Sequence, residues 1–387
     1  MRGRCAVIVL DGLGIGCCPD QTAYGDRGSD TLGNVARAVG GLRLPNLERI
    51  GLGCCRPIAG LACGSATAAQ GVAIPQSKGK DSTTGHWELC GLTLERPFPT
   101  YAEGFPPEII RAFSEMTGRP VIGNRAASGT AILTELGDQH QRTGAWIVYT
   151  SADSVFQVAA HEGTIPLDEL YAACAAARER VLVGSHAVSR VIARPFVGTA
   201  GDWRRTGNRR DFSVVPPGET LLDRLAAAAI PRVGIGKVDD LFAGRNITAT
   251  HVPTNPEAYA RIADALRTMD SGFLFVNVPE FDQTWGHRND VAGFHEGLVA
   301  LDAALPGLLD LLRPDDLVML TADHGNDPTT PSTDHSREAV PILVAGPRVR
   351  PVALGERVFG AIGGTVAEYF GMAGDGFLQE VAPWAMP

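Results

Sequence analysis

The stretch "CAVIVLDGLGIG", residues 5–16, joins six apolar residues directly to an aspartate and a glycine-rich turn. A short apolar run that ends in turn residues predicts a buried strand, and we expect a strand here rather than a signal peptide. Sites in open α/β sheets form at the carboxyl ends of the strands. Asp11, at the end of this strand, is therefore a candidate site residue.

The same pattern of a strand followed by polar residues recurs late in the chain. "GFLFVNVPEFD" (272–282), "DDLVMLTADHGND" (315–327) and "AVPILVAGP" (339–347) are predicted strands with polar or turn residues behind them. Helices are expected after Ser29 and Asp30, which are plausible caps, and over 358–371 near the end of the chain. This alternation predicts an α/β protein with a mostly parallel central sheet flanked by helices.

The middle of the chain differs from both ends. It contains Pro-rich turns, the predicted strands "GAWIVYTSAD" and "RVIARPFVG", an Ala-rich helix over 167–181, and the basic segment "DWRRTGNRRDF". Because 387 residues exceed the usual size of one compact core, two domains are expected. We expect residues 96–212 to form an inserted α+β domain, and residues 1–95 and 213–387 to form a split core domain.

Composition excludes several classes of protein. The formal charge of −9 argues against a dedicated nucleic-acid-binding protein, and no apolar run approaches the roughly 20 residues of a membrane helix. The eight cysteines include two adjacent pairs and no CxxC ladder, so reduced, mostly buried thiols are expected. These features predict a cytoplasmic protein.

Potential metal ligands stand behind the predicted strands at four places. Aspartate and histidine together suit Mn²⁺, Fe²⁺ or Zn²⁺, and two neighbouring metals can clamp the attacking and leaving oxygens in phosphoryl transfer. Each piece has a simpler explanation, because a lone aspartate after a strand is usually a turn residue. Together, the four segments favour a dinuclear metal site. The candidate ligands are Asp11, Asp282, His287, Asp323, His324 and His335.

The stretch "GKDSTTGHWELCG", residues 79–91, places three hydroxyls between an acid and a histidine. A polar turn that caps a helix would explain one or two of these residues and leave Lys80, Asp81 and His86 without a role. The sharper hypothesis is a nucleophilic hydroxyl that accepts a phosphoryl group beside the metals. A helix is expected to begin at residues 84–86, where free N–H groups favour an incoming anion.

These motifs resemble those of the phosphopentomutases, a family within the alkaline phosphatase-like superfamily of metalloenzymes. The resemblance rests on "VIVLDGLGIG", "GKDSTTGHWELCG", "YTSADS", "VIARPFVG", "FDQTWGHRND" and "LTADHGNDPTTPSTDHSRE", and it runs over essentially the whole chain. It implies an alkaline phosphatase-like core with a cap domain, and the six ligands above holding two Mn²⁺ or other divalent ions. It also implies interconversion of the 1-phosphates and 5-phosphates of ribose and deoxyribose. The route it implies passes through a phosphorylated enzyme and a pentose 1,5-bisphosphate, with a sugar bisphosphate as activator.

The chain departs from the family at the phosphoryl acceptor. The family has a threonine directly after the aspartate of "GKD", whereas this chain has Ser82 there. Serine can carry out the same chemistry, so Ser82 is the expected acceptor and Thr83 the alternative. A second departure lies before His287, where Glu280 and Trp285 are expected to alter the surroundings of the ligands or the wall of the pocket.

The resemblance also implies contacts to the substrate from Ser151, Asp153, Arg194, Arg209 and Lys237. Arg194 lies in an apolar strand, where a guanidinium is costly unless an anion pairs with it. The arginines of 204–210 have a simpler interpretation as a solvated face, and Asp153 has one as a turn residue.

Other functions compete with a pentose phosphate mutase. A related mutase could act on a modified pentose phosphate, a phosphomonoesterase of the same fold would release phosphate to water, and a non-catalytic descendant would only bind sugar phosphate. The inserted domain favours a mutase, because a mutase must hold the bisphosphate and exclude water.

Overall fold

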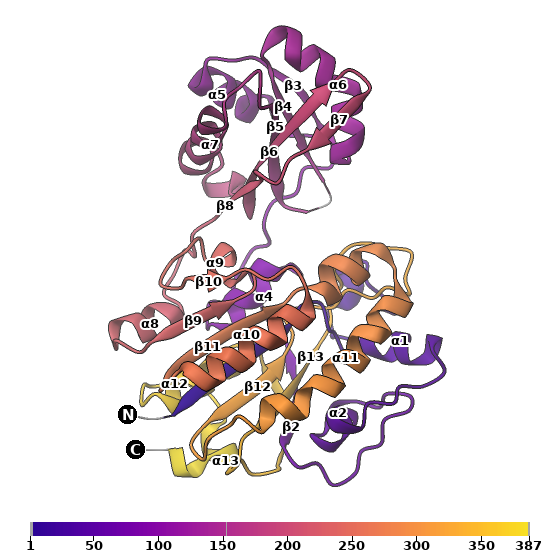
Figure 1. The fold of residues 1–387 in the computed structure, drawn as a ribbon, viewed down its shortest axis with the longest axis vertical. Coiled ribbons are helices and arrows are strands. Elements are labelled where there is room, and N and C mark those ends of the chain that lie inside the picture. The colour runs from indigo at the N-terminus through magenta and orange to yellow at the C-terminus, as the bar shows by residue number, and fades with distance from the viewer. Residues whose placement is uncertain (1–2, 152, 386–387) are drawn as a thin grey trace. The chain divides into compact units, whose positions relative to one another are not determined.

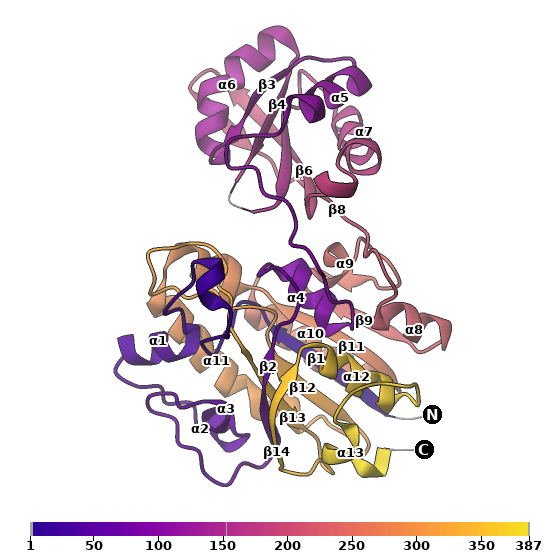
Figure 2. The ribbon, with the colours of Figure 1, turned by 180° about the vertical axis from the view of Figure 1, so that it is seen from behind.

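A computed structural model describes residues 3–151 and 153–385 (Figures 1 and 2). The chain forms two compact units: unit 1 is Met1–Pro97 with Pro216–Pro387, and unit 2 is Phe98–Val215. The boundaries expected from the sequence were 95/96 and 212/213. The role of unit 2 as a cap for the substrate stays a prediction.

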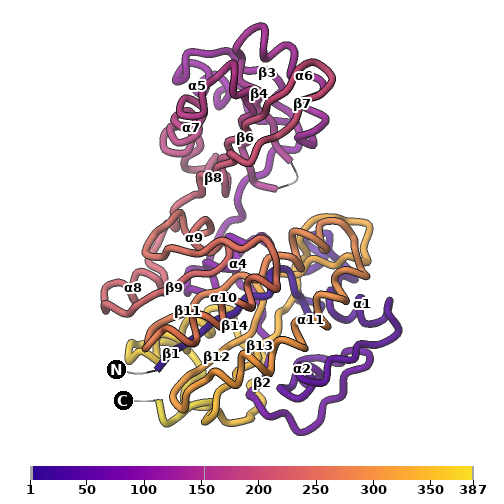
Figure 3. Tube along the Cα trace, in the orientation of Figure 1, coloured from indigo at the N-terminus to yellow at the C-terminus, as the bar shows by residue number. Residues whose placement is uncertain are grey.

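The central sheet of unit 1 is built around the first apolar run. This run forms β1 (Arg4–Leu10), which is buried along its whole length. β1 pairs in parallel with β11 (Gly272–Val278) on one side and with β12 (Leu317–Thr321) on the other. In Figure 3 the indigo β1 accordingly runs beside orange segments from late in the chain.

The order of the sheet is β10-β9-β11-β1-β12-β13-β2-β14. Among the described strands of this sheet, only β13 is antiparallel to its neighbours. The predicted α/β class, with a mostly parallel central sheet flanked by helices, is confirmed. The other strands of the sheet are β2 (Ala69–Ile74), β9 (Arg232–Ile235), β10 (Ala249–Thr250), β13 (Val340–Ala345) and β14 (Ala353–Val358).

Helices cover both faces of this sheet. Figures 1 and 2 show α10 (Asn255–Thr268) and α11 (Val291–Leu309) over one face, with α4 (Ser82–Leu89) and α12 (Gly360–Tyr369) on the other. The remaining helices of unit 1 are α1 (Thr31–Ala38), α2 (Pro45–Arg49), α3 (Leu52–Cys55), α8 (Leu221–Ala227), α9 (Val238–Leu241) and α13 (Leu378–Val381). Short 3₁₀ or π turns occupy Gln21–Tyr24, Phe281–Trp285, Gly286–Arg288 and Pro383–Ala385.

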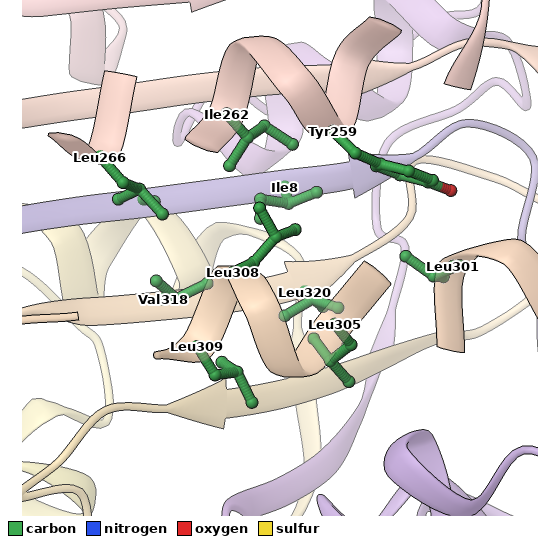
Figure 4. Close-up of a pocket in the computed structure, with 11 residues that line it drawn as sticks. Ile8, Tyr259, Ile262, Leu266, Leu301, Leu305, Leu308, Leu309, Val318 and Leu320 are labelled. Atoms are coloured by element: carbon green, nitrogen blue, oxygen red, sulfur yellow. The ribbon is translucent and has the colours of Figure 1, made fainter. Parts of the chain in front are cut away.

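The core under α10 and α11 is aliphatic. Ile8 and Leu320 of the sheet face Ile262 of α10 and Leu305 of α11 around a small apolar pocket (Figure 4). Burial of such side chains stabilises the sheet by about 25 cal/mol per Å² of apolar surface. The pocket lies in the packing layer of the core.

Unit 2 has its own sheet and core. The strand order is β3-β4-β5-β6-β7, and β8 also pairs with β6. Two apolar clusters lie within the unit, one around Trp146 and Phe156 and the other around Tyr149 and Phe196. The strands are β3 (Val121–Ala126), β4 (Trp146–Thr150), β5 (Val155–His161), β6 (Arg190–Thr199), β7 (Asp202–Arg205) and β8 (Arg210–Ser213). The helices are α5 (Pro107–Thr117), α6 (Gly129–Thr143) and α7 (Leu167–Ala176), with short turns at Ala177–Val181 and Gly184–His186.

The expectation of reduced cysteines is wrong at one pair. Cys54 and Cys63 form a disulfide, because the turn between them brings their Cα atoms to 4.5 Å. The thiols of Cys5, Cys18, Cys55, Cys90 and Cys174 are free and buried, and that of Cys17 is free and exposed.

Within the described residues, no helix has both the length and the apolar character that crossing a membrane requires.

Candidate metal centre and phosphoryl acceptor

Six neighbouring strands of unit 1 bring polar side chains to one edge of the sheet. The parallel strands β9, β11, β1, β12 and β2 end at this edge, and the antiparallel β13 begins there. Each strand is followed or preceded by residues singled out in the sequence. These residues are Lys237 after β9, Asp282 and His287 after β11, Asp11 after β1, Asp323 and His324 after β12, His335 before β13 and Ser82 after β2.

All six predicted metal ligands converge at this edge. Asp282 lies at the centre: its Oδ2 is 3.4 Å from His287 Nε2 and its Oδ1 is 3.3 Å from His335 Nε2. His324 Nε2 in turn lies 3.3 Å from Asp11 Oδ1 and 3.4 Å from Asp323 Oδ2.

Two overlapping groups of three can be drawn within this cluster. One contains Asp282, His287 and His335, and the other contains Asp11, Asp282 and His324, with one ligand atom per residue and all such atoms within 4.8 Å. The sequence predicted two neighbouring ions without indicating a common ligand, and the shared Asp282 would suit such a pair as a ligand of both.

The electrostatics of the cluster favour cations. Burial would raise the pKa of Asp282, but His335 and His287 beside it hold that pKa well below its usual range. Burial would lower the pKa of His324, but Asp323 and Asp11 raise it to about 10. The three carboxylates are nearly inaccessible to solvent, so ionised oxygens are concentrated where little water can screen them.

One oxygen in particular fits a metal ligand. Asp323 Oδ1 accepts a hydrogen bond from the Gly12 amide, which orients the carboxylate. Its Oδ2 is buried, and its polar neighbours are the ring nitrogens His86 Nδ1 at 3.1 Å and His324 Nε2 at 3.4 Å. A buried carboxylate oxygen among imidazoles is a donor set that suits a divalent cation. The residues present therefore fit the predicted metal centre.

Close backbone approach explains two glycines at the site. Gly12 has a φ of 79°, and a Cβ there would lie 3.1 Å from Cβ of Asn326. Gly85 lies in α4 where the helix crosses the Asp323 backbone, and a Cβ would lie 2.2 Å from the Asp323 carbonyl oxygen. Any side chain at residue 85 would push the helix that carries Ser82 away from the ligands.

Ser82 is the first residue of α4, and Asp81 is its N-cap, whose carboxylate accepts a hydrogen bond from the Thr84 amide. The expected helix start at 84–86 is therefore wrong by two residues or more, because the Asp81 cap lets the helix begin at Ser82. Ser82 Oγ lies 3.0 Å from His324 Nε2 and 3.4 Å from Asp11 Oδ1. Thr83 is also buried, but in the described structure no hydrogen bond joins its hydroxyl to the six candidate ligands.

Lys237 lies within the metal cluster. Its Nζ is 2.6 Å from Asp11 Oδ2 and 4.0 Å from Asp282 Oδ2. Burial would lower the pKa of Lys237, but Asp11 and Asp282 raise it. The ammonium group is therefore a fixed positive charge at the site, compatible with the predicted contact to phosphate.

The other predicted substrate residues lie in unit 2. Ser151 and Asp153 follow β4 and are partly buried. Arg194 is partly buried in β6, with its Nε donating to Gln157 Oε1 at 3.1 Å. Burial, with the charges of Arg209 and Arg205 nearby, lowers the pKa of Arg194 to about 10. Arg209 pairs with Asp211 through two bonds of 2.7 Å.

The second departure from the family motif, at Glu280 and Trp285, lies outside the ligand cluster. Glu280 accepts a hydrogen bond from the Asn255 amide through Oε2, and its own amide donates to Asn255 Oδ1. Trp285 packs on Phe281 and against Gly293 and Gly297 of α11. Both residues therefore support α10 and α11.

Sequence reasoning missed the residues that hold the ligands in place. Asn326 Nδ2 donates to Asp282 Oδ1, and Glu338 accepts hydrogen bonds from the amides of Gly16 and Thr31. Arg337, beside Glu338, is buried as well. The sequence feature that could have revealed them is a pair of adjacent charges, Arg337 and Glu338, just before the apolar strand β13.

Comparison with known proteins identifies the family of this chain. The model of the metalloenzyme superfamily matches residues 3–374. A phosphopentomutase from Anaeromyxobacter sp. strain K is 54% identical over 388 residues, covering 98% of this chain and 100% of the relative. The chain belongs to the phosphopentomutase family.

Other members of that family are similarly close. The phosphopentomutase of Carboxydothermus hydrogenoformans is 52% identical over 374 residues, covering 95% of this chain and 96% of the relative.

Among solved structures, phosphoglycerate mutase from Leishmania mexicana matches with a TM-score of 0.49 and 14% identity, covering 96% of each chain. Phosphopentomutases are metal-dependent enzymes of the metalloenzyme superfamily, so this chain is expected to bind divalent metal.

Proposed function

We propose that this enzyme interconverts the 1-phosphates and 5-phosphates of ribose and deoxyribose, with Ser82 as the phosphoryl acceptor. The observation that carries the assignment of Ser82 is its place at the first turn of α4, with Oγ 3.0 Å from His324 Nε2 and 3.4 Å from Asp11 Oδ1. Full-length similarity to phosphopentomutases supports the reaction.

The six predicted ligands would hold two divalent ions. Three carboxylates and three imidazoles favour Mn²⁺ over Mg²⁺, because imidazole suits borderline metals and Mg²⁺ prefers oxygen. When bound, such ions lower the pKa of a hydroxyl and neutralise charge on the transferring phosphoryl group. Lys237 adds a positive charge beside Asp11.

In the proposed reaction Ser82 takes part in two successive phosphoryl transfers. Phosphorylated Ser82 gives its phosphoryl group to a hydroxyl of the pentose phosphate, which forms the 1,5-bisphosphate and restores the serine hydroxyl. The Ser82 hydroxyl then accepts the phosphoryl group from the other position of the bisphosphate. This step yields the isomeric monophosphate and regenerates the phosphorylated enzyme. A sugar bisphosphate would load the serine for the first turnover.

Unit 2 supplies an anion-binding surface for this proposal. Tyr149, Arg194, Arg205 and Arg209 lie close together: burial raises the pKa of Tyr149, while the three arginines act in the opposite direction. Partly desolvated guanidinium groups bind phosphate strongly and with defined geometry. Ser151 and Asp153 are proposed to contact the pentose hydroxyls.

One experiment separates the candidate reactions. Purified enzyme with Mn²⁺ and a trace of pentose bisphosphate is given ribose 5-phosphate, and formation of ribose 1-phosphate is measured beside release of inorganic phosphate. Isomer without free phosphate supports the mutase. Stoichiometric free phosphate would support a phosphomonoesterase, and neither product would indicate a binding protein or a modified pentose phosphate as substrate.

A cytoplasmic location is proposed as well. The buried free thiols of Cys5, Cys90 and Cys174 fit a reducing compartment, whereas the Cys54–Cys63 disulfide does not. Separation of the protein under non-reducing conditions, directly from cells, decides whether that disulfide exists there.

A further inference from the structure

Arg337 is a buried arginine two residues beyond the candidate ligand His335. Its side chain is 2% exposed, yet every N–H of its guanidinium has an acceptor. Nε and Nη2 donate to the Asp20 carboxylate at 3.1 and 3.0 Å, and Nη2 also donates to the Pro75 carbonyl at 2.9 Å. Nη1 donates to the carbonyls of Ser77 and Gly79 at 2.7 and 2.8 Å.

The three backbone acceptors alternate along one segment. Pro75, Ser77 and Gly79 lie between the end of β2 and Asp81, the N-cap of α4. The segment bends at Ser77 and Lys78, so the three carbonyls turn toward one planar guanidinium, which holds them all. The segment it holds runs directly into Ser82.

The other side of this segment is fixed by Glu88 of α4. Its carboxylate accepts hydrogen bonds from the amides of Gln76 and Ser77, both at 2.7 Å. The backbone between β2 and Ser82 is therefore held by a cation on its carbonyls and an anion on its amides. Burying a charge is costly unless hydrogen bonds satisfy it, and the backbone of this segment supplies such bonds to both side chains.

The guanidinium itself is fixed in orientation. It lies over the ring of Tyr24, with Cζ 4.8 Å from the ring centroid, and Asp20 holds its edge through two bonds. The Arg337 amide donates to Asp26, whose carboxylate also accepts from Lys80 in the same segment. The strand entrance that carries His335 is thus joined to the acceptor loop at two points.

We propose that Arg337 is a positioning residue for the phosphoryl acceptor, which sets Ser82 Oγ against the ligand cluster by holding the carbonyls of residues 75, 77 and 79. This inference rests on the proposed role of Ser82. In-line phosphoryl transfer requires the acceptor oxygen at one place, and a displacement of about 1 Å costs about a hundredfold in rate. Substrate contacts in unit 2 do not involve Arg337.

The test compares Arg337→Met with Arg4→Met in the full-length, metal-loaded enzyme. Arg4 is a matched control: its side chain is 1% exposed, it pairs with Asp316, and it lies at the far end of β1. That strand spans about 20 Å at ~3.3 Å per residue, so Arg4 is remote from Ser82. Both variants lose a buried arginine and its ion pair with an aspartate, although Asp20 is 37% exposed and Asp316 only 1% exposed. The Arg4 control therefore removes the more deeply buried pair without touching the acceptor loop.

We expect Arg337→Met to lower kcat about 10- to 100-fold below that of Arg4→Met. The KM for ribose 5-phosphate should stay within about twofold, and the content of divalent metal should be equal in both. The rate at which a pentose bisphosphate phosphorylates the Ser82 peptide should fall by the same factor as kcat. Arg337→Lys should be intermediate, because an ammonium group cannot span the three carbonyls.

Hydrogen exchange tests the clamp without reference to activity. Amides of residues 76–84 should exchange about tenfold faster in Arg337→Met and at the wild-type rate in Arg4→Met. Equal exchange, or equal kcat for the folded fractions of the two variants, would overturn the inference. If Arg337→Met does not fold, kcat and hydrogen exchange of Arg337→Lys and Asp20→Asn are compared with those of Arg4→Met instead. Failure of the wild-type enzyme to isomerise pentose phosphates would instead contradict the proposed function. The exchange result would still show whether Arg337 holds the loop before Ser82.

Discussion

The Ser82 hydroxyl owes its place to its neighbours on either side. Asp81 ends the preceding loop as the N-cap, and Gly85 lets α4 lie against the Asp323 backbone. Thr83, the alternative acceptor, follows on the next position of the same helix, about 100° further around its axis. The two adjacent hydroxyls therefore point in different directions, and it is Ser82 Oγ that lies 3.0 Å from His324 Nε2.

Replacement of Ser82 by Ala should abolish isomerisation, because among the described residues Ser82 has the hydroxyl that contacts both His324 and Asp11. Thr83→Ala is the matched control and should retain most of the activity, while Ser82→Thr should retain some. After incubation with a pentose bisphosphate, mass spectrometry should place one added phosphate on Ser82. Phosphate on Thr83, or turnover in Ser82→Ala, would transfer the role to the neighbouring residue.

Arg194→Ala should weaken substrate use about 10- to 100-fold in kcat/KM, since a charge-assisted contact contributes roughly 1.5–3 kcal/mol. Arg209→Ala should have a smaller effect, because Arg209 already pairs with Asp211. Metal content should not change in either variant. Arg204→Ala is the control: this side chain is 70% exposed and lies 3.5 Å from Asp202. If all three variants had the kcat/KM of the wild type, the arginine surface would not be part of the substrate site.

At the scale of elements, the strand ends were predictable and the helix starts were less so. An apolar run followed by Asp11, Asp282 or Asp323 marks a strand and its carboxyl end by composition alone. The start of α4 depends on one side-chain hydrogen bond, from the Thr84 amide to Asp81, which the sequence allows but does not require. The Cys54–Cys63 pairing likewise depends on the path of the turn between the two residues.

The start of α8 gives a prediction about stability and pH. Thr220 and Asp223 form a capping box, and although burial acts in the opposite direction, hydrogen bonds from Thr220, Asn246 and Arg245 lower the pKa of Asp223. A carboxyl with a lowered pKa stabilises the fold above its unfolded value of 3.8 and loses that effect as pH falls.

Asp223→Asn should therefore lower the free energy of unfolding by about 1 kcal/mol at neutral pH, and the difference from wild type should shrink below about pH 4. Urea unfolding followed by circular dichroism at pH 7 and pH 3.5 measures this. Asp264→Asn, at an exposed ion pair of α10, is the control and should show no such difference. A pH-independent effect of Asp223→Asn would show that the cap does not depend on the charge.

Over the whole molecule, the sequence singled out the candidate metal ligands but not the buried charged residues around them. The ligands follow apolar strands in a mostly parallel sheet, so their convergence follows from topology. Arg337 and Glu338 are visible in the sequence only as two charges before a strand, and their partners are up to 322 residues away. Long-range hydrogen bonds of this kind have no local pattern, so reading along the chain could not reveal them.

The metal centre also links ligand binding to the stability of unit 1. Asp11, Asp282 and Asp323 are buried and close together, and protonated His324 and Lys237 are among the groups that offset their charge. A divalent ion that binds only the folded state adds about 2.7 kcal/mol at a free concentration of 100 times its Kd. Chelation should therefore lower the melting temperature of the full-length enzyme, and Mn²⁺ should restore it.

Hydrogen exchange should locate this loss of stability. Chelation should speed exchange in β1 and β12 of unit 1 and leave β4 and β5 of unit 2 unchanged, because all six predicted ligands belong to unit 1. Asp323→Asn should abolish most of the response to Mn²⁺ and reduce the bound metal by at least one ion. Asp239 lies in the partly exposed cluster with Asp240 and His251. Asp239→Asn should keep the response to Mn²⁺ and the full content of bound metal. If Asp323→Asn kept its full metal content and its thermal shift, Asp323 would not be a metal ligand.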